Sequence, residues 1–384
     1  MSVTFAKGFR AAGVTAGLKA SGKPDVALVV NDGPLAAAAG VFTSNRIQAA
    51  PVQWSKQAAK TGTFKAVILN SGGANACTGP EGFADTHRTA EHVAELLGIG
   101  AIDVAVCSTG LIGKRLPMDL LIAGVTTAHG ELSEDGGQAA ATAIMTTDSV
   151  SKSSHYEAPA GWRVGGMAKG AGMLAPGLAT MLVVITTDAD VVPADLDAAL
   201  RSATNTTFDR IDSDGCMSTN DTVLLLASGS SQIVPDAAEF AQAVHYVSAD
   251  LARQLIGDAE GATKDIKIVV TGAASESDAV DVARTVSRSN LLKCAIHGED
   301  PNWGRVLSAL GTTQAVFEAD AIDVSFNGVA VCRNGAALAV EPVVDLAGRE
   351  VTIDINLNAG NLEATLWTND LTAMYVHENS AYST

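Results

Sequence analysis

The sequence predicts an α/β protein whose C-terminal part is richer in strands. Short apolar runs that end in turn-forming residues indicate buried strands, and stretches with apolar residues at helical spacing lie between them. Near the C-terminus, apolar and polar residues alternate over short segments, which is typical of half-buried strands. The chain has 384 residues, more than one hydrophobic core usually serves, so we expect a large domain and a smaller one.

Three strands and a helix are expected in the first half of the chain. The strands cover residues 26–30, 65–69 and 103–107, and each runs into a turn of glycine and small polar residues. The helix covers residues 89–97, where apolar residues recur three or four positions apart. Gly98 follows it as a C-terminal stop.

In the second half of the chain, helices alternate with strands at first, and strands predominate in the last part. Pro193 opens one helix, and an apolar stripe over residues 240–255 indicates a longer one. A strand over 266–270 and a helix over 277–288 follow.

The C-terminal part contains the most specific turn signal in the sequence. Residues 322–326 and 329–332 are joined by Asn327-Gly328, a dipeptide that tolerates the positive φ angles of a tight hairpin. Residues 351–357 then alternate apolar with polar. We expect this strand to pair, through a turn at 358–361, with the strand that follows.

The charge and cysteine content exclude several classes of protein. With 42 acidic and 25 basic residues, the formal net charge of −17 disfavours nucleic acid and anionic membranes as partners. The five cysteines are widely spaced and form no Cys-x-x-Cys pair, so we expect free thiols, a reducing compartment and no metal site. No apolar run reaches the roughly 18 residues of a membrane span, and we expect a cytoplasmic protein without a signal peptide.

Two segments could carry chemistry. Residues 169–188 join a glycine-rich loop to a strongly β-forming strand that begins at Thr180, and residues 108–110 follow another strand. From the residues alone, the first segment could be a plain loop entering a core strand, and the second a turn that caps the next element. Gly110 to Lys114 lacks the spacing of a phosphate-binding loop, so ATP chemistry is not indicated.

The first of these segments resembles the signature of the ornithine acetyltransferase (glutamate N-acetyltransferase) family, in which a Lys-Gly-small-Gly-Met loop leads to Ala-Thr-Met-Leu. Gly177-Leu178 and Gly73 depart from the family pattern without removing a reactive group. Further segments similar to the family occur in the same order from end to end, at residues 7–14, 41–46, 70–79, 145–148, 218–222, 300–305 and 378–384.

The resemblance implies a layered α/β/β/α arrangement with mixed sheets, and a chain that cuts itself between Ala179 and Thr180. The fragments would be residues 1–179 and 180–384. A catalytic core over 1–265 would be joined by a C-terminal unit over 266–384, whose tail closes the active site.

The resemblance also implies the roles of single residues. Freed by the cut, Thr180 would be the nucleophile, and its own α-amino group, with a reference pKa of roughly 7.7–8, would accept the hydroxyl proton. Thr109 and Gly110 would form the oxyanion hole. Substrate binding is implied for six residues: Thr147, Lys169, Thr180, Glu260, Asn379 and Thr384.

The implied reaction is a ping-pong transfer of acetyl from N2-acetylornithine to glutamate, in arginine biosynthesis. No cofactor or metal is expected, and whether acetyl-CoA also serves as donor stays open. The implied partners are the two fragments themselves, as an α2β2 heterotetramer, and small amino acids. An aminopeptidase or amidase with the same nucleophile, and a catalytically silent binding protein, are the alternatives.

Overall fold

The computed structural model describes residues 2–175 and 181–381, which divide into two compact units. The first unit contains the chain up to Asp209 together with Cys216–Asp258. The second contains Arg210–Gly215 and the chain from Ala259 on. The boundary expected after residue 265 differs from this division, in which the second unit begins at Ala259 and also includes the short segment Arg210–Gly215.

One of the two sheets in the first unit has four strands, in the order β1-β2-β4-β5. β4 and β5 are parallel, whereas β1, β2 and β4 pair antiparallel, so the sheet is mixed. The strands are β1 (Phe9–Val14), β2 (Val26–Asn31), β4 (Ala66–Asn70) and β5 (Val104–Ser108). The three strands expected in this half of the chain are therefore confirmed.

The other sheet of the first unit has five strands, in the order β3-β9-β8-β7-β6. β8 and β9 are parallel, and the remaining neighbours pair antiparallel. The strands are β3 (Ala37–Phe42), β6 (Lys152–Glu157), β7 (Arg163–Lys169), β8 (Leu182–Thr187) and β9 (Thr222–Ala227).

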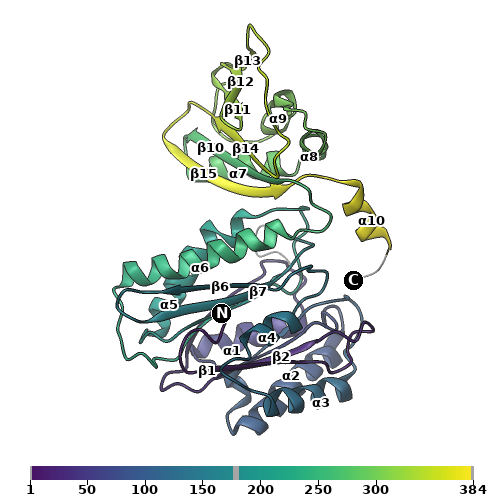
Figure 1. Ribbon diagram of the computed structural model, residues 1–384, viewed down its shortest axis with the longest axis vertical. Helices are drawn as coiled ribbons and strands as arrows, with labels where there is room; N and C mark the ends of the chain where they lie inside the picture. The colour runs from purple at the N-terminus through teal and green to yellow at the C-terminus, as the bar shows by residue number, and fades with distance from the viewer. Residues whose placement is uncertain (1, 176–180, 382–384) are drawn as a thin grey trace. The chain divides into compact units, whose positions relative to one another are not determined.

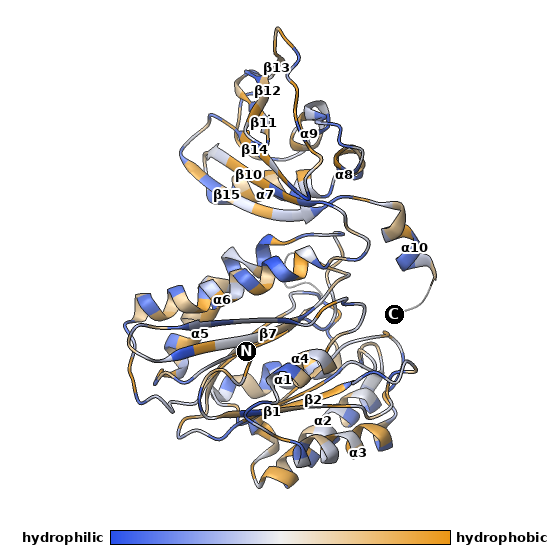
Figure 2. Ribbon diagram, in the orientation of Figure 1, coloured by the Kyte–Doolittle hydropathy of each residue, from blue (hydrophilic) through white to orange (hydrophobic). Residues whose placement is uncertain are grey.

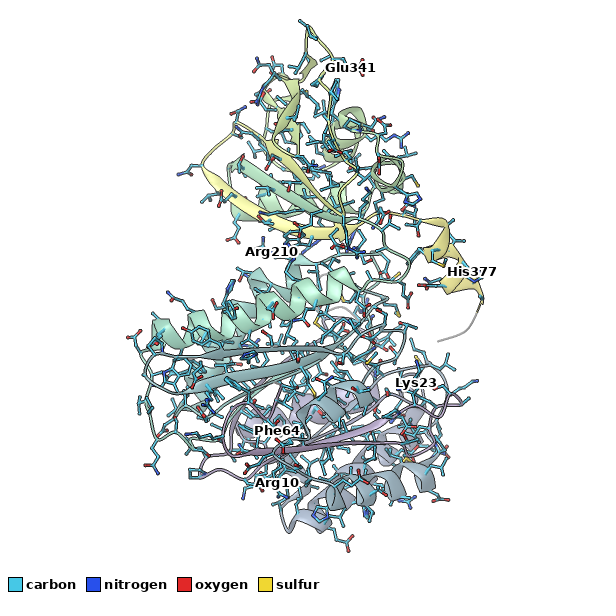
Figure 3. The ribbon with its side chains drawn as sticks, in the orientation of Figure 1. Arg10, Lys23, Phe64, Arg210, Glu341 and His377 are labelled. Carbon is cyan, nitrogen blue, oxygen red and sulfur yellow. The ribbon has the colours of Figure 1, made fainter. Side chains whose placement is uncertain are left out.

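The two sheets pack face to face through a core of mostly small and branched apolar residues. The core also contains Phe64, which is labelled in Figure 3. Successive residues of each strand point to opposite faces. In β2, Ala27 and Val29 therefore enter the core between the sheets, while Val26 and Leu28 meet the outer helices. Low aromatic content suits this arrangement, because small side chains let two sheets and a short helix share one core.

Helices cover the outer face of each sheet, which gives the α/β/β/α layers expected from the resemblance (Figure 1). α5 and α6 lie on the five-stranded sheet, and Figure 2 shows hydrophilic and hydrophobic residues alternating along α6, as in an amphipathic helix. α2 and α3 lie beside the four-stranded sheet, and α4 contacts strands of both sheets. The helices are α1 (Ala50–Ala58), α2 (Gly79–Leu97), α3 (Met118–Gly130), α4 (Gly137–Ala143), α5 (Pro193–Thr206) and α6 (Ala237–Gly257).

Helix α2 starts ten residues before the helix that its spacing predicted, and its end at Leu97 is confirmed. Gly98 adopts the left-handed conformation, with φ of 66°, that terminates a helix. Residues 79–88 were missed because Gly79, Pro80 and Gly82 are typical of loops.

The second unit is a six-stranded sheet with three helices packed on it. The hairpin at Asn327-Gly328 is confirmed, with φ of 48° and 78° at its two central residues. The strands are β10 (Asp265–Ala273), β11 (Asp323–Phe326), β12 (Val329–Arg333), β13 (Ala336–Ala337), β14 (Glu350–Asn356) and β15 (Leu362–Asn369). The helices are α7 (Glu276–Ser287), α8 (Asn290–His297), α9 (Trp303–Leu310) and the terminal α10 (Ala373–Ala381).

The expected pairing of β14 with β15 is wrong, because β10 lies between them in the order β11-β14-β10-β15. The loop after β14 crosses the end of β10: the Ala359 and Gly360 amides both donate to the Gly272 carbonyl, at 2.7 and 2.8 Å. The connection from β14 to β15 therefore crosses over β10, although the loop is as short as that of a hairpin. Among the described residues, no helix is long and apolar enough to cross a membrane.

Candidate active site

The first part of the candidate site lies where the parallel strands β4 and β5 end. Both strands are fully buried, and Thr109 follows β5 with 2% of its surface exposed. Its backbone N–H donates to the Asn70 carbonyl at 3.0 Å, and Asn70 Nδ2 donates to Ser108 Oγ at 2.7 Å. The residues that follow the two strands are thus held side by side.

Gly110 must be a glycine for two reasons. Its φ of 129° lies in a region that residues with a side chain rarely adopt. A Cβ atom at this position would also come within 2.9 Å of the Gly73 backbone. The backbone of residue 110 therefore approaches the loop after β4 more closely than any side chain would allow.

Lys169 brings a positive charge to Thr109. It is the last residue of β7 and only 1% exposed, and its ammonium donates to Thr109 Oγ1 at 3.2 Å and to Thr146 Oγ1 at 2.7 Å. Because an ammonium group can only donate, Thr109 Oγ1 accepts from Lys169 and keeps its own hydrogen for another acceptor. This is the arrangement that an oxyanion donor needs.

A buried carboxylate, Asp148, holds this cluster together. It accepts hydrogen bonds from the Thr146 amide at 2.9 Å, the Gly170 amide at 2.6 Å and the Lys152 ammonium at 2.7 Å. Burial alone would raise the pKa of Asp148, but the charges of Lys169 and Lys152, with the hydrogen bonds from Lys152 and Gly170, lower it to about 2. Asp148 is therefore ionised at neutral pH and balances the buried lysines.

The hydroxyl that contacts Lys169 belongs to Thr146, whereas the residue singled out from the sequence was its neighbour Thr147. Thr147 is partly exposed and directly precedes Asp148. Adjacent threonines cannot be told apart without knowing which one faces the lysine, so the sequence offered no signal for Thr146. Asp148 was visible only as the last residue of the quoted segment 145–148.

The start of β8 adjoins the same cluster. The Met181 amide donates to Asp221 Oδ1 at 3.0 Å. Next to Asp221, the side-chain amide of Asn220 donates to the carbonyls of Ala74, at 2.6 Å, and Ser108, at 2.8 Å. The loop before β9 is thereby tied to the ends of β4, β5 and the beginning of β8.

Three of the predicted residues, Ala179, Thr180 and Thr384, lie outside the described residues. In the second unit, Asn379 Nδ2 donates to Glu260 Oε2 at 2.9 Å, so these two predicted substrate contacts meet. In the first unit, Thr109, Gly110 and Lys169 come together, with Thr147 one residue from the cluster.

A model of the ArgJ family matches residues 10–384 of the chain. The chain belongs to the ArgJ family. Arginine biosynthesis bifunctional protein ArgJ of Streptomyces coelicolor is 67% identical over 383 residues, with 100% of both chains covered. The protein of the same name from Thermobifida fusca is 60% identical over 384 residues, also with 100% of both chains covered.

Among solved structures, ornithine acetyltransferase of Mycobacterium tuberculosis in complex with ornithine is 60% identical. The match covers 47% of this chain and 96% of that chain, with a TM-score of 0.46. The family assignment made from the sequence is confirmed by the match of the ArgJ-family model.

Three segments that resemble the ArgJ family are far apart in sequence and meet in the first unit. Asn70 comes from the segment 70–79, Thr146 and Asp148 from 145–148, and Asn220 and Asp221 from 218–222. Lys169 contacts the second segment through Thr146, and Met181 contacts the third through Asp221.

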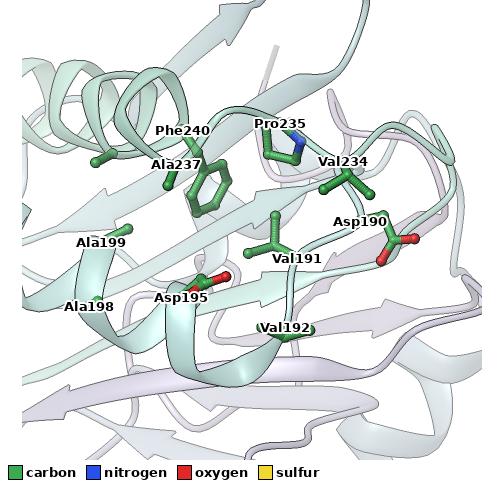
Figure 4. Close-up of a pocket in the computed structure, with 11 residues that line it drawn as sticks. Asp190, Val191, Val192, Asp195, Ala198, Ala199, Val234, Pro235, Ala237 and Phe240 are labelled. Carbon is green, nitrogen blue, oxygen red and sulfur yellow. The ribbon is translucent and has the colours of Figure 1, made fainter.

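A separate pocket of about 310 Å³ lies between α5 and α6 and is drawn in Figure 4. Its walls are mostly apolar, with Phe240 inside and two acids, Asp190 and Asp195, in the lining. None of the predicted site residues that the structure describes lines it. In the second unit, His297 Nδ1 pairs with Asp370 Oδ2 at 2.8 Å.

Proposed function

We propose that this chain is a glutamate N-acetyltransferase of arginine biosynthesis, which moves acetyl from N2-acetylornithine to glutamate. The observation that carries the proposal is membership of the ArgJ family over nearly the whole chain, with relatives named for arginine biosynthesis at 60–67% identity. The buried Lys169–Thr109 contact supports an acyl-transfer site, because it leaves a hydroxyl hydrogen to face an oxyanion.

Thr180 is the proposed nucleophile, and self-cleavage of the Ala179–Thr180 peptide bond would make it an N-terminal residue. A threonine hydroxyl needs a base near neutral pH, and the amino group freed by the cut supplies one. Thr180 immediately precedes Met181, whose amide is held by the buried Asp221. The residue that follows the proposed nucleophile is therefore held just before β8.

Donor and acceptor are both α-amino acids, so we assign one pocket to both. Lys169, Thr147, Glu260, Asn379 and Thr384 would contact the substrate, as the resemblance to the family implies. The Glu260–Asn379 hydrogen bond supports a joint role for that pair, because each orients the other. One pocket cannot hold both substrates together, so the acetyl group would stay covalently bound to Thr180 between the two half-reactions. This predicts ping-pong kinetics.

A second activity, amino-acid N-acetyltransferase with acetyl-CoA as donor, is part of the proposal because the relatives are named bifunctional. We further propose that the fragments stay together as an α2β2 heterotetramer in the cytoplasm, without metal or cofactor. The alternative of an aminopeptidase or amidase would require water to discharge the acyl-enzyme readily.

Intact-mass measurement of the purified protein tests the cut. We expect fragments 1–179 and 180–384, and a single uncut chain for Thr180→Ala, since the attacking hydroxyl is gone. A Thr180→Ala protein that still splits at this bond would overturn the mechanism.

Rapid-quench mass spectrometry tests the transfer. Incubation with N2-acetylornithine alone should add one acetyl group to the fragment 180–384, and glutamate should remove it as N-acetylglutamate. Initial-rate plots should give parallel lines. Intersecting lines without an acetylated fragment would rule out Thr180 as carrier, and release of free acetate at the same rate without glutamate would favour the hydrolase.

A further inference from the structure

Lys19 lies in the loop between β1 and β2, where a buried carboxylate holds the backbone. Asp25 is fully buried and directly precedes β2. Its carboxylate accepts the backbone N–H groups of Ala16 and Leu18, both at 2.6 Å, and that of Lys19 at 3.1 Å. Because three amides bind one charged group, the fold itself determines where the backbone of Lys19 lies.

The ammonium group of Lys19 reaches the segment that also binds Lys169. It donates to the Met145 carbonyl at 2.7 Å and to the Pro24 carbonyl at 2.8 Å. Met145 directly precedes Thr146, whose hydroxyl accepts a hydrogen bond from Lys169 at 2.7 Å. Two buried or half-buried lysines therefore bind neighbouring residues of one segment of the candidate site.

The loop that carries Lys19 also contacts the residues beside the predicted oxyanion hole. Leu18 packs so closely against Gly72 that a Cβ atom on the glycine would lie 2.2 Å from Leu18 Cβ. Gly73, the next residue, approaches Gly110 in the same way. The loop of Lys19 is therefore tied to the candidate site from two sides.

The ammonium group of Lys19 has one donor to spare. An ammonium group carries three N–H donors, and the two carbonyls take two of them. Among the residues that the structure describes, no acceptor binds the third. Lys19 is only half-buried, so a small molecule can reach this donor.

The two amino acids of the proposed reaction differ at the ends of their side chains. N2-acetylornithine has one carboxylate and a side-chain ammonium group, whereas glutamate has two carboxylates. One cation suffices for the carboxylate that both share, and Lys169 is the cation predicted to contact the substrate. The second carboxylate of glutamate, once it leaves water, needs a second cation.

We propose that Lys19 binds the side-chain carboxylate of glutamate and so selects the acceptor, an assignment that rests on the acetyl transfer proposed above. The third N–H of Lys19 donates to that carboxylate, while the carbonyls of Met145 and Pro24 hold the ammonium group in place. N2-acetylornithine has no carboxylate at this end. Lys19 therefore favours the half-reaction in which glutamate accepts the acetyl group.

The charge of Lys19 gives this assignment a pH dependence. Burial, the largest cause, acts with the charges of Lys169 and Lys23 to lower the pKa of Lys19 to about 8, against the carboxylates of Asp25 and Asp148. Lys19 is therefore mostly charged at pH 7 and loses its charge as the pH rises through about 8. Glutamine has the same α-amino group as glutamate but an uncharged side chain, so the ratio of kcat/KM for the two acceptors isolates this titration.

Steady-state kinetics with N2-acetylornithine as donor test the assignment, because kcat/KM for each substrate of a ping-pong reaction reports its own half-reaction. Lys19→Met should lower kcat/KM for glutamate by about 10- to 100-fold, through loss of one charge-assisted hydrogen bond. The values for glutamine and for the donor should not fall, and Lys19→Arg should restore part of the loss. An unchanged preference for glutamate over glutamine, or an equal loss for the donor, would overturn the proposal.

Lys23→Met is the matched control. Lys23 is an exposed lysine of the same loop and is labelled in Figure 3. Its substitution removes one positive charge near the site without removing the donor that faces glutamate, so the preference for glutamate over glutamine should stay as in the wild type. An equal fall in this control would assign the effect to net charge and remove the role of Lys19.

The wild-type protein gives a measurement that no substitution can disturb. Its ratio of kcat/KM for glutamate to that for glutamine should fall as the pH rises through about 8, since neutral Lys19 no longer attracts the carboxylate. A ratio that stays constant over this range would contradict the proposal. A wild-type protein that transfers acetyl from N2-acetylornithine to neither amino acid would instead defeat the proposed function itself, so the two failures are distinguishable.

Discussion

At the scale of single residues, the candidate site depends on which group donates each hydrogen bond. Thr109 Oγ1 accepts a hydrogen bond from Lys169, so the hydrogen of the threonine hydroxyl points away from the lysine. Removing the hydroxyl would delete this donor and one acceptor of Lys169, which keeps its hydrogen bond to Thr146 Oγ1 at 2.7 Å.

Thr109→Val should lower kcat for acetyl transfer by roughly 10²- to 10³-fold with little change in KM, because an oxyanion donor acts mainly in the transition state. Steady-state kinetics with both substrates would measure this. Thr127→Val removes an exposed hydroxyl on α3 that donates to the Ala123 carbonyl of the same helix, at 3.1 Å, and should leave kcat unchanged. Wild-type turnover of Thr109→Val would contradict the assignment.

Asp148→Asn should destabilise the protein by about 3 kcal/mol at pH 7, because it removes the buried negative charge beside Lys169 and leaves Lys152 paired with Asp258 alone. The folded pKa of Asp148, about 2, is below its unfolded value, so its stabilisation is complete above about pH 4 and disappears as the pH falls toward 2. The difference from wild type in urea unfolding should therefore shrink over that range. A difference independent of pH would show that Asp148 acts without its charge.

At the scale of elements, the crossover after β14 depends on a glycine at the end of β10. Gly272 has φ of 64°, and a Cβ atom there would lie 2.1 Å from Asn356 Oδ1 and 2.9 Å from the Asn358 nitrogen. The loop can pass over the strand end only because this side chain is missing.

Gly272→Ala should therefore lower the free energy of unfolding by about 2 to 3 kcal/mol, as the sum of backbone strain and displacement of the loop. Gly328→Ala is its control, since Gly328 also has a positive φ, 78°, but nothing within 4 Å of the added methyl group. That change should cost only about 1 kcal/mol. Urea unfolding of both variants would measure the difference. Equal losses in the free energy of unfolding would show that the loop moves aside without destabilising the protein.

Elements with strong local signals could be predicted from the sequence, and pairings between distant elements could not. Gly98 and Asn327-Gly328 determine backbone angles by themselves, so the end of α2 and the β11–β12 hairpin were predicted correctly. The partner of β14 was missed because its choice depends on β10, some eighty residues earlier in the chain. The alternation of apolar and polar residues shows which face of a strand is buried, but not which strands pair with it.

The same limit applied to the site. The resemblance to a family pointed to Thr109 and Lys169, which meet in the structure. Thr146 and Asp221 were not singled out within the segments 145–148 and 218–222, because their hydrogen-bond partners, Lys169 and Met181, are known only from the folded chain.

At the scale of the whole molecule, a cut after Ala179 would divide the five-stranded sheet without separating it. In the order β3-β9-β8-β7-β6, the two strands that follow the cut lie between strands that precede it. Fragment 1–179 should therefore co-purify with a tag placed at the C-terminus of fragment 180–384, even after extensive dilution. In strong denaturant the tag should retain only its own fragment, and loss of 1–179 in native buffer would contradict this sheet order.

The six residues Arg210–Gly215 make the second unit discontinuous in sequence. The Asp212 carboxylate pairs with Arg288 at 2.7 Å, and the Asp212 backbone N–H donates to the Trp367 carbonyl at 2.9 Å. The Ser213 carbonyl accepts a hydrogen bond from the buried Lys293. A gene segment that encoded only residues 259–384 would lose these contacts and leave a buried ammonium short of an acceptor. Recombination could not transplant this unit as a single cassette, so an exchange between related genes would have to carry two separate stretches of DNA together.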